Sequence, residues 1–291
     1  MKENFLNLAS KYEIPIVKIM STNELGLDFI TAVGEDYYGK KWILRIPRRA
    51  DMISQIEYEE KCLSVIKSIV SFDVPDWKVA THELIAYPLL TDIPALDVNP
   101  VSQEYTWNIN LESFEYSESL ASILYELHAI PIQQLEKFEI KRPSINETRQ
   151  KLLDDITLIK KELGLSSRLE TQWRTWIDEE TYWPSFSSII HGDLYAGHTL
   201  VDSKNNITGI IDWSEIQVGD SSLDFVGHYI GLGEAHLDKT LETYKKMGGQ
   251  IWPRMKDHIV QSSSASPLKF AVFALETKNE IHIQAAREQL K

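Results

Sequence analysis

The sequence predicts an α+β protein of two lobes, an N-terminal antiparallel β-sheet lobe with one main helix and a larger, mostly helical C-terminal lobe. Short apolar runs separated by turn residues follow one another in the first part of the chain, as in sequential antiparallel strands. Apolar residues at helical spacing dominate the rest. Pro88 and Pro94 mark the change of pattern, so we expect the lobes to be residues 1–90 and 91–291.

The N-terminal lobe is expected to contain five strands with one helix inserted after the third. A short amphipathic helix should precede them at residues 3–12, before Pro15. Apolar runs predict the strands, and the turn-rich residues 34–39 separate the second strand from the third. The expected strands are residues 16–20, 29–33, 42–46, 77–80 and 83–87, and the expected main helix is residues 54–69.

The C-terminal lobe is expected to consist of helices with one apolar face. Leu120, Ile123, Leu124 and Leu127 fall at positions i, i+3, i+4 and i+7, which predicts a helix that ends before Pro131. Further helices are expected at residues 152–163, 221–229 and 237–246 and after residue 267.

The most informative segment lies between residues 189 and 213. Its pattern is an apolar strand, a polar turn with Asp193, a second strand, a turn at residues 205–206 and a third strand that ends at Asp212. His-Gly-Asp is also a common turn sequence, but His198 and Asp212 supply the context of a catalytic loop. Phosphoryl transfer needs one carboxylate to orient a hydroxyl nucleophile and another to hold the metal that bridges the phosphates. The segment therefore predicts a small-molecule kinase.

Composition and charge restrict the possible partners. The fractions of hydrophobic and charged residues, 43% and 25%, are those of an ordinary globular protein. A net charge of −13 argues against nucleic acid or an anionic membrane as a partner and suits a cationic substrate. Cys62 is the only cysteine, which excludes an intramolecular disulfide and a cysteine-rich zinc site, and we expect it to be buried in a helix. Without an apolar signal segment or a long apolar run, the chain is expected to be cytoplasmic.

Several short segments carry a resemblance to a known family. They are LGLDF at 25–29, WILRIPRR at 42–49, LIAYPL at 84–89, LHAIP at 127–131, HGD at 191–193, GHT at 197–199 and IDWSE at 211–215. With these the chain resembles the aminoglycoside-phosphotransferase-like family, a branch of the protein-kinase-like fold, over nearly its whole length. Most members have asparagine at the position of His198, whereas the macrolide 2′-phosphotransferases have histidine, so the resemblance is closest to that group.

The resemblance implies that Asp193 is the catalytic carboxylate, which contacts the substrate hydroxyl, and that Asp212 binds Mg²⁺. From the residues alone, Asp212 is also compatible with an exposed turn residue. His198 is implied as a metal-site residue. Magnesium prefers oxygen ligands, so His198 either ligates the metal, acts through a water molecule or orders the loop. His191 is expected to hold the loop by hydrogen bonds, and His128 to have a structural role.

Nucleotide contacts are implied in the N-terminal lobe. Arg45 occupies the position where the third strand of kinases carries a lysine, and it keeps a permanent cation there. Its expected partner is Glu59, with Glu57 and Glu60 as alternatives. Arg45 is also compatible with an ordinary surface position. Gly26 is the only glycine between the first two strands, so the sequence has no glycine-rich phosphate loop there.

The connection between the lobes is expected to bind the purine through its backbone. The implied residues are Tyr87 and Leu89, within residues 87–90. Macrolide kinases favour GTP, so we expect GTP as the phosphate donor, with ATP as an alternative.

The implied acceptor is a macrolide, phosphorylated on the 2′-hydroxyl of its amino sugar. Glu215, Asp220 and Asp224 join Asp193 in an acidic neighbourhood that suits a protonated dimethylamino group. Asp220 is equally compatible with a helix N-cap, and Asp224 with a support for the catalytic loop.

Aromatic residues of the helical lobe are candidates for the walls of a macrolide pocket, although most such residues belong to a core. The candidates are Tyr195, Phe225 and Tyr229. Two other functions remain open at this stage. One is a kinase for aminoglycosides or for a small alcohol such as choline. The other is a catalytically silent, nucleotide-binding interaction module, against which the presence of both Asp193 and Asp212 argues.

Overall fold

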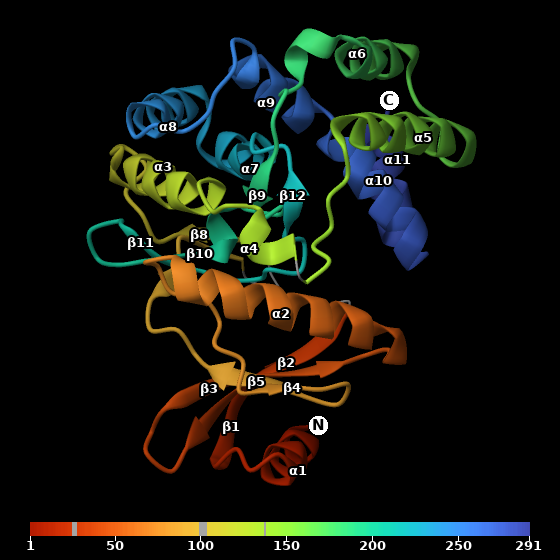
Figure 1. Cartoon of the computed structure of the whole chain (residues 1–291). Helices are drawn as coiled ribbons and strands as arrows, with labels where there is room; N and C mark the ends of the chain where they lie inside the picture. The colour runs from red at the N-terminus through yellow and green to blue at the C-terminus, as the bar shows by residue number, and fades with distance from the viewer. Residues whose placement is uncertain (25–27, 99–103, 137) are drawn as a thin grey trace.

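The computed structural model describes residues 1–24, 28–98, 104–136 and 138–291. Figure 1 shows the N-terminal sheet at one end of the molecule and most of the helices at the other, with helix α2 between them. The expected α+β arrangement, an N-terminal antiparallel sheet with a helix and a mostly helical remainder, is confirmed. Gly26, which the sequence analysis considered for the phosphate loop, lies outside the described residues.

The N-terminal sheet has five antiparallel strands in the order β1-β2-β3-β5-β4. As expected, one main helix follows the third strand. The elements are α1 (Lys2–Lys11), β1 (Ile16–Asn23), β2 (Phe29–Asp36), β3 (Lys41–Pro47), the 3-10 turn η1 (Ala50–Met52), α2 (Ile53–Ile69), β4 (Val79–Ala80) and β5 (Ile85–Pro88). The alternation of side chains along β3 places Leu44 in a core with Phe5 of α1, and Ile43 against the cluster that includes Ile56 of α2.

Helix α2 packs against the helical part as well as against the sheet. Its residues Cys62, Leu63 and Ile66 belong to the main core of the helical part, whereas Ile56 packs against the sheet. Cys62 is fully buried, as expected. A division of the chain at residue 90 into separate lobes remains a prediction, and this shared helix joins the two sides of that boundary.

The helical part is built around two apolar cores, one against α2 and one around Trp173 and Trp176. Its helices are α3 (Glu115–His128), α4 (Gln133–Glu136), α5 (Ile145–Glu162), α6 (Ser167–Asp178), η2 (Glu180–Tyr182), α7 (Leu223–Leu232), α8 (Glu234–Lys246), α9 (Met255–Ser264), α10 (Ser266–Thr277) and α11 (Glu280–Gln289). The sequence analysis did not predict α6 and α9. No helix within the described ranges is long and apolar enough to cross a membrane.

Short strands bring two loops of the central segment together. Strand β10 pairs with β11 and with β6, and β9 pairs with β12. The elements are β6 (Ile93–Pro94), β7 (Leu96–Val98), β8 (Tyr105–Trp107), β9 (Ser188–Ile190), η3 (Ala196–His198), β10 (Thr199–Val201), β11 (Ile207–Ile210) and β12 (Gln217–Gly219). We call residues 191–198 the first loop and residues 211–216 the second loop. The N–H of Ile211 donates to the carbonyl of His198 at 2.9 Å, so the two loops are hydrogen-bonded to each other.

Candidate functional site

A buried carboxylate holds the backbone of the first loop by hydrogen bonds. Asp224, on α7, accepts hydrogen bonds from the backbone N–H groups of His191 and Gly192, both at 2.9 Å. It also accepts one from Nε2 of His128 at 3.1 Å. Burial alone would raise the pKa of Asp224, but His128, His191 and the amide of Gly192 lower it below its ordinary value. The expectation that Asp224 supports the loop therefore agrees with the geometry.

Gly192 fills a position in which a side chain does not fit. Its φ is +87°, a left-handed conformation, and a Cβ there would lie 2.4 Å from the carbonyl oxygen of Glu215. The two loops are therefore in direct backbone contact beside Asp193. Gly227 on α7 also has no room for a side chain, because a Cβ there would lie 2.3 Å from the carbonyl oxygen of Leu194.

His191 holds the first loop by hydrogen bonds, as predicted. The ring is fully buried, and Nε2 donates to the carbonyl of Ile211 at 3.0 Å. Its Nδ1 accepts a long hydrogen bond from the N–H of Asp193 at 3.4 Å. Burial lowers the pKa of His191, which favours the neutral ring that this pattern requires.

Asp193, His198 and Asp212 lie together, with the histidine between the two carboxylates. Oδ2 of Asp193 is 3.9 Å from Nδ1 of His198, and Oδ2 of Asp212 is 3.6 Å from Nε2 of the same ring. The side chain of Asp193 is 65% exposed and that of Asp212 is 43% exposed, so both carboxylates can reach a bound molecule. The sequence analysis predicted these three as site residues, and the structure brings them together.

Asp212 has a left-handed backbone with a φ of +64°, which is uncommon for a residue other than glycine. Such conformations persist where the surrounding structure enforces them, often at functional sites. The hydroxyl of Ser214 donates to Oδ1 of Asp212 at 3.3 Å, which orients the carboxylate. The sequence analysis did not single out Ser214.

The ligand set of one carboxylate beside one histidine nitrogen is too small for a zinc ion and sufficient for a magnesium ion. Within the described part of the chain, no three or more ligand-type side chains (His, Cys, Asp or Glu) are grouped to hold a metal. Magnesium does not need such a cage, because it keeps several water molecules and binds one or two carboxylates plus the phosphates of a substrate. Asp212 and, through Nε2, His198 are the residues that could hold it.

A cavity of about 440 Å³ opens between the N-terminal sheet and the second loop. Its walls combine apolar residues of β2, β3 and β5 with polar residues of the second loop. They include Phe29, Ile43, Arg45, Tyr87, Leu89, Leu90, Leu200, Ile211, Asp212 and Ser214. The predicted nucleotide residues Arg45, Tyr87 and Leu89 therefore line one cavity together with the predicted metal residue Asp212.

Arg45 and Glu59 are neighbours inside the protein. Nη1 of Arg45 is 3.9 Å from Oε1 of Glu59, and their side chains are 14% and 2% exposed. The guanidinium also lies over the ring of Phe29, 4.1 Å from its centroid. Arg45 is thus not a surface residue, and Glu59, rather than Glu57 or Glu60, is the carboxylate beside it.

The protonation of this pair depends on its burial. Burial raises the pKa of Glu59 to about 7, although Arg45 opposes the increase. Burial alone would lower the pKa of Arg45, but Tyr87, Glu59 and Asp212 together raise it. The guanidinium therefore stays positive, and it lines the same cavity as Asp212.

A larger cavity of about 790 Å³ lies on the other side of the first loop. Asp193, Glu215 and Asp220 line it, together with apolar and aromatic side chains from α5, α6, α9 and α10. The aromatic members are Trp176, Trp183 and His258. The rings of Trp176 and Trp183 are stacked with centroids 5.3 Å apart, and His258 lies edge-on to Trp183 at 4.5 Å. The sequence analysis missed all three aromatic residues.

Asp220 is committed to a buried hydrogen-bond chain. Nε2 of His258 donates to Oδ2 of Asp220 at 2.7 Å, and the backbone N–H of Ser222 donates to Oδ1 at 2.9 Å. Nε1 of Trp176 donates to Nδ1 of His258 at 3.0 Å, so the ring accepts a hydrogen bond on one nitrogen and donates one from the other. Asp220 is only 2% exposed. It therefore positions α7 and the aromatic wall and offers little of its carboxylate to a ligand.

Tyr195, Phe225 and Tyr229 lie away from this cavity. Phe225 is fully buried in the main core, edge-on to Tyr244, so it has no surface for a substrate. Tyr229 packs against the same core. Tyr195 is 38% exposed and contacts the ring of His198 edge-on, with centroids 4.3 Å apart. An apolar residue on a helix can face the core or a cavity with the same spacing, which is why the sequence pattern misplaced Phe225. Tyr229 is only partly buried, and its contact with a substrate stays a prediction.

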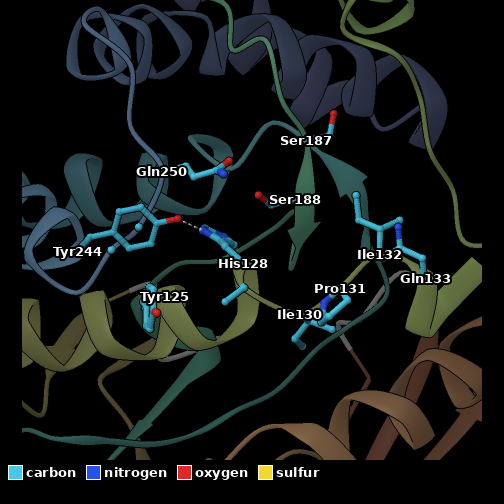
Figure 2. Close-up of a pocket in the computed structure, with 13 residues that line it drawn as sticks. Tyr125, His128, Ile130, Pro131, Ile132, Gln133, Ser187, Ser188, Tyr244 and Gln250 are labelled. Carbon is cyan, nitrogen blue, oxygen red and sulfur yellow. Dashed lines mark hydrogen bonds between the residues drawn. The ribbon is translucent and has the colours of Figure 1, made fainter.

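A third cavity, of about 360 Å³, lies behind the first loop (Figure 2). Figure 2 shows His128 at its edge, pointing toward the hydroxyl of Tyr244, to which Nδ1 is hydrogen-bonded at 2.9 Å. The Nε2 side of the same ring holds Asp224, so His128 links this region to the first loop. The structural role expected for His128 agrees with these contacts.

Comparison with known proteins relates this architecture to a family. Residues 28–258 match the sequence pattern of the Phosphotransferase enzyme family. The uncharacterized protein YcbJ of Bacillus subtilis (strain 168) is 38% identical over 272 residues, which cover 92% of this chain and 88% of that protein.

Two solved structures are similar over almost the whole chain. Macrolide 2′-phosphotransferase type I is 37% identical with a TM-score of 0.92, and the match covers 98% of this chain and 94% of that one. Macrolide 2′-phosphotransferase MphH from Brachybacterium faecium, an apoenzyme structure, is 32% identical with a TM-score of 0.90, and covers 99% of this chain and 97% of that one. These likenesses confirm the expected kinase-like α+β fold.

Proposed function

Because the chain belongs to the phosphotransferase enzyme family, we propose that it transfers the γ-phosphate of GTP to the 2′-hydroxyl of the amino sugar of a macrolide antibiotic, which inactivates the drug. One observation carries the proposal. The cavity of about 440 Å³ contains Asp212 and the cavity of about 790 Å³ contains Asp193, and the ring of His198 lies between these two carboxylates. A nucleotide in the first cavity and an alcohol in the second would meet at this point.

Each residue then has a distinct task. Asp193 aligns the acceptor hydroxyl with the γ-phosphorus and accepts its proton, while Asp212 and His198 would hold Mg²⁺. When bound, Mg²⁺ neutralises charge on the β- and γ-phosphates. Arg45, kept positive beside Asp212, binds the phosphates, and Glu59 orients Arg45.

The nucleotide is held in the cavity of about 440 Å³, and residues 1–90 form the nucleotide-binding lobe. The backbone at Tyr87 and Leu89 contacts the purine, and both residues line the cavity wall. GTP is proposed because the chain resembles macrolide kinases, and ATP is the alternative donor.

The larger cavity suits a macrolide because it combines apolar walls with few free charges. Its volume of about 790 Å³ lies in the range of sites for drug-sized ligands. Trp176 and Trp183 line its apolar wall but are only 3% and 9% exposed, so each offers a macrolactone or a sugar face a small apolar contact. Glu215 has no hydrogen bond or ion pair to its side chain among the described residues, so it is available to a protonated dimethylamine. Phe225 is left out of the proposed contacts, Tyr229 stays a candidate outside this cavity, and Tyr195 remains a candidate only beside His198.

The test is a panel of acceptors with two donors. Erythromycin, kanamycin and choline are each incubated with the protein, Mg²⁺ and either GTP or ATP, and the products are analysed by mass spectrometry. We expect a single phosphate added to erythromycin, with GTP as the better donor. Transfer to kanamycin or choline but not to erythromycin would replace the proposed acceptor. Absence of transfer to all three, with intact nucleotide binding, would favour the silent interaction module.

A further inference from the structure

The charged side chains that line the larger cavity differ in whether they already have a partner in the protein. We use the name acceptor cavity for the larger cavity of about 790 Å³. Its charged residues are Arg142, Glu147, Lys151, Asp155, Asp193, Glu215, Asp220 and Lys269. Most of them already have a hydrogen-bond or ion-pair partner in the protein, so their side chains are less available to a ligand.

The partners are visible in the structure. Nζ of Lys151 is 3.0 Å from Oδ2 of Asp155. Glu147 accepts a hydrogen bond from the backbone N–H of Ser144 at 2.7 Å as part of the capping box of α5. The two remaining partnered residues are Arg142, which is 3.5 Å from Glu136, and Asp220, which is bonded to His258.

Glu215 and Lys269 are different. Among the residues that the structure describes, neither side chain has a hydrogen bond or an ion pair. Asp193, the third residue with an available charge, has only His198 nearby, at 3.9 Å. The surrounding protein lowers the pKa of Lys269, while the negative charges of Asp193, Asp220 and Glu215 oppose the decrease. Lys269 thus lies within electrostatic reach of the carboxylates that would receive a cationic acceptor.

We propose that Lys269 is a charge filter of the acceptor cavity, which admits an acceptor with one ammonium group and disfavours an acceptor with several. The inference rests on the proposed function, in which Glu215 pairs with a single protonated amine. A second ammonium group in the same cavity would meet the unpaired Lys269, because Asp193 is engaged with the acceptor hydroxyl and Asp155 and Asp220 already have partners. Unpaired like charges in a cavity weaken binding and so reject the wrong partner.

The filter separates the two antibiotic classes by charge alone. A macrolide such as erythromycin carries one dimethylammonium group, whereas an aminoglycoside such as kanamycin carries several ammonium groups. Each additional ammonium group would be repelled by the positive charge of Lys269. At the effective dielectric constant near a protein surface, one such repulsion weakens binding of the acceptor about tenfold. Lys269 is therefore a specificity determinant and takes no part in the chemical step.

The test compares Lys269→Met with two matched variants. Lys269→Arg keeps the charge, and Lys245→Met removes a lysine charge from the exposed end of α8, outside the cavity. The dissociation constants for kanamycin and erythromycin are measured by calorimetry, together with those for spermine and choline. We expect Lys269→Met to improve binding of the polycation relative to the monocation about tenfold in each pair, while the two controls keep the wild-type ratio. Lys269→Gln repeats the charge removal if the methionine variant is unstable.

Two outcomes would overturn the filter. One is an unchanged polycation-to-monocation ratio in Lys269→Met and Lys269→Gln. The other is an equal change in Lys245→Met, which would indicate an effect of net charge only. The amine pair keeps this test separate from the proposed function: if the wild-type protein fails to phosphorylate erythromycin, the proposed acceptor is wrong, and spermine against choline still decides the role of Lys269.

Discussion

The imidazole of His198 donates a hydrogen bond from Nδ1 to the backbone carbonyl of Asp193, at 2.8 Å. Because a carbonyl only accepts, this contact places a proton on Nδ1, and in a neutral ring it leaves the lone pair on Nε2. Nε2 faces Oδ2 of Asp212 at 3.6 Å. His198 is therefore hydrogen-bonded to the backbone of one predicted catalytic residue and faces the side chain of the other, at the expected metal position.

This geometry predicts a graded response to substitution of His198. His198→Ala removes both contacts and should raise the Mg²⁺ concentration needed for half-maximal transfer about 10- to 100-fold. His198→Asn supplies an oxygen, which magnesium prefers, and should retain activity within about tenfold of wild type. The Mg²⁺ concentration at half-maximal transfer is the measurement. If the alanine variant keeps the wild-type value, His198 only orders the first loop.

Asp193 is predicted to act on the acceptor rather than on the nucleotide. Asp193→Asn should lower kcat by about 10²- to 10⁴-fold, the range of general-base contributions, and should leave the dissociation constant of GTP nearly unchanged. Its side chain is 65% exposed, so the variant should fold normally. Near-normal turnover in the folded variant would mean that the hydroxyl is oriented by another group.

Asp212 is predicted to act through the metal. Asp212→Ala should abolish the magnesium-dependent part of GTP binding, because this carboxylate is expected to bridge the ion to the protein. Titration calorimetry with and without Mg²⁺ measures that part directly. Ser214→Ala should have a smaller effect on magnesium-dependent binding, since it removes only the 3.3 Å hydrogen bond to Oδ1 of Asp212. Unchanged magnesium dependence in Asp212→Ala would place the metal elsewhere.

The buried carboxyl of Glu59 predicts a stability change with pH. Its pKa is raised from 4.5 to about 7 in the folded protein, so between these values the unfolded chain ionises while the folded protein stays protonated. The contribution of Glu59 to stability is complete below pH 4.5 and is lost as the pH rises through 7. Relative to Glu59→Gln, the wild-type free energy of unfolding should fall by about 3 kcal/mol across this range.

The measurement is urea unfolding of the nucleotide-free protein at pH 4.5 and at pH 7. Glu60→Gln is the control, because Glu60 lies on the same helix and is exposed. It should follow the wild-type pH dependence. A parallel response of wild type and Glu59→Gln would show that Glu59 is ionised throughout, as a tight ion pair with Arg45.

The parts of the fold that could be predicted are those with strong local signals. Strands such as β2 and β3 follow from apolar runs bounded by turns, and α3 follows from an unbroken apolar face. Helix α9 was missed because much of its buried face is polar. His258 and Ser262 are buried there beside Met255 and Ile259, so the apolar periodicity is weak. Helix α6 was missed although its buried Leu169, Trp173, Trp176 and Ile177 have helical spacing.

The same contrast applies to the site. Asp193, His198 and Asp212 lie within one short segment, so their spacing could be interpreted. The partner of Asp220 is His258, which is 38 positions away on a helix that was not predicted, and no local pattern indicates their contact. Of the predicted acidic neighbourhood, Asp193, Glu215 and Asp220 line one cavity, whereas Asp224 is buried against the backbone of the first loop. Tertiary hydrogen bonds, rather than sequence, decide which of its carboxylates is available.

The last prediction concerns that available carboxylate. With Asp220 bonded to His258 and Asp224 bonded to the first loop, Glu215 is the carboxylate that we expect to bind the acceptor amine. Burial raises the pKa of Glu215, so its ionised form, which pairs with the amine, is lost earlier than usual as the pH falls. In an amino macrolide the reacting hydroxyl is adjacent to the amine, so the contact also fixes the nucleophile.

A double-mutant cycle separates this contact from recognition of the macrolactone. The four values of kcat/KM come from wild type and Glu215→Gln, each with an amino macrolide and its des-amino analogue. For wild type, loss of the amine should lower kcat/KM about tenfold or more, because a desolvated carboxylate is left without its partner. In Glu215→Gln that penalty should nearly disappear, since the partner is already neutral. A full penalty in the variant would assign the amine to another group, with Asp193 as the nearest candidate, and equal values for both acceptors in wild type would mean that the macrolactone alone provides recognition.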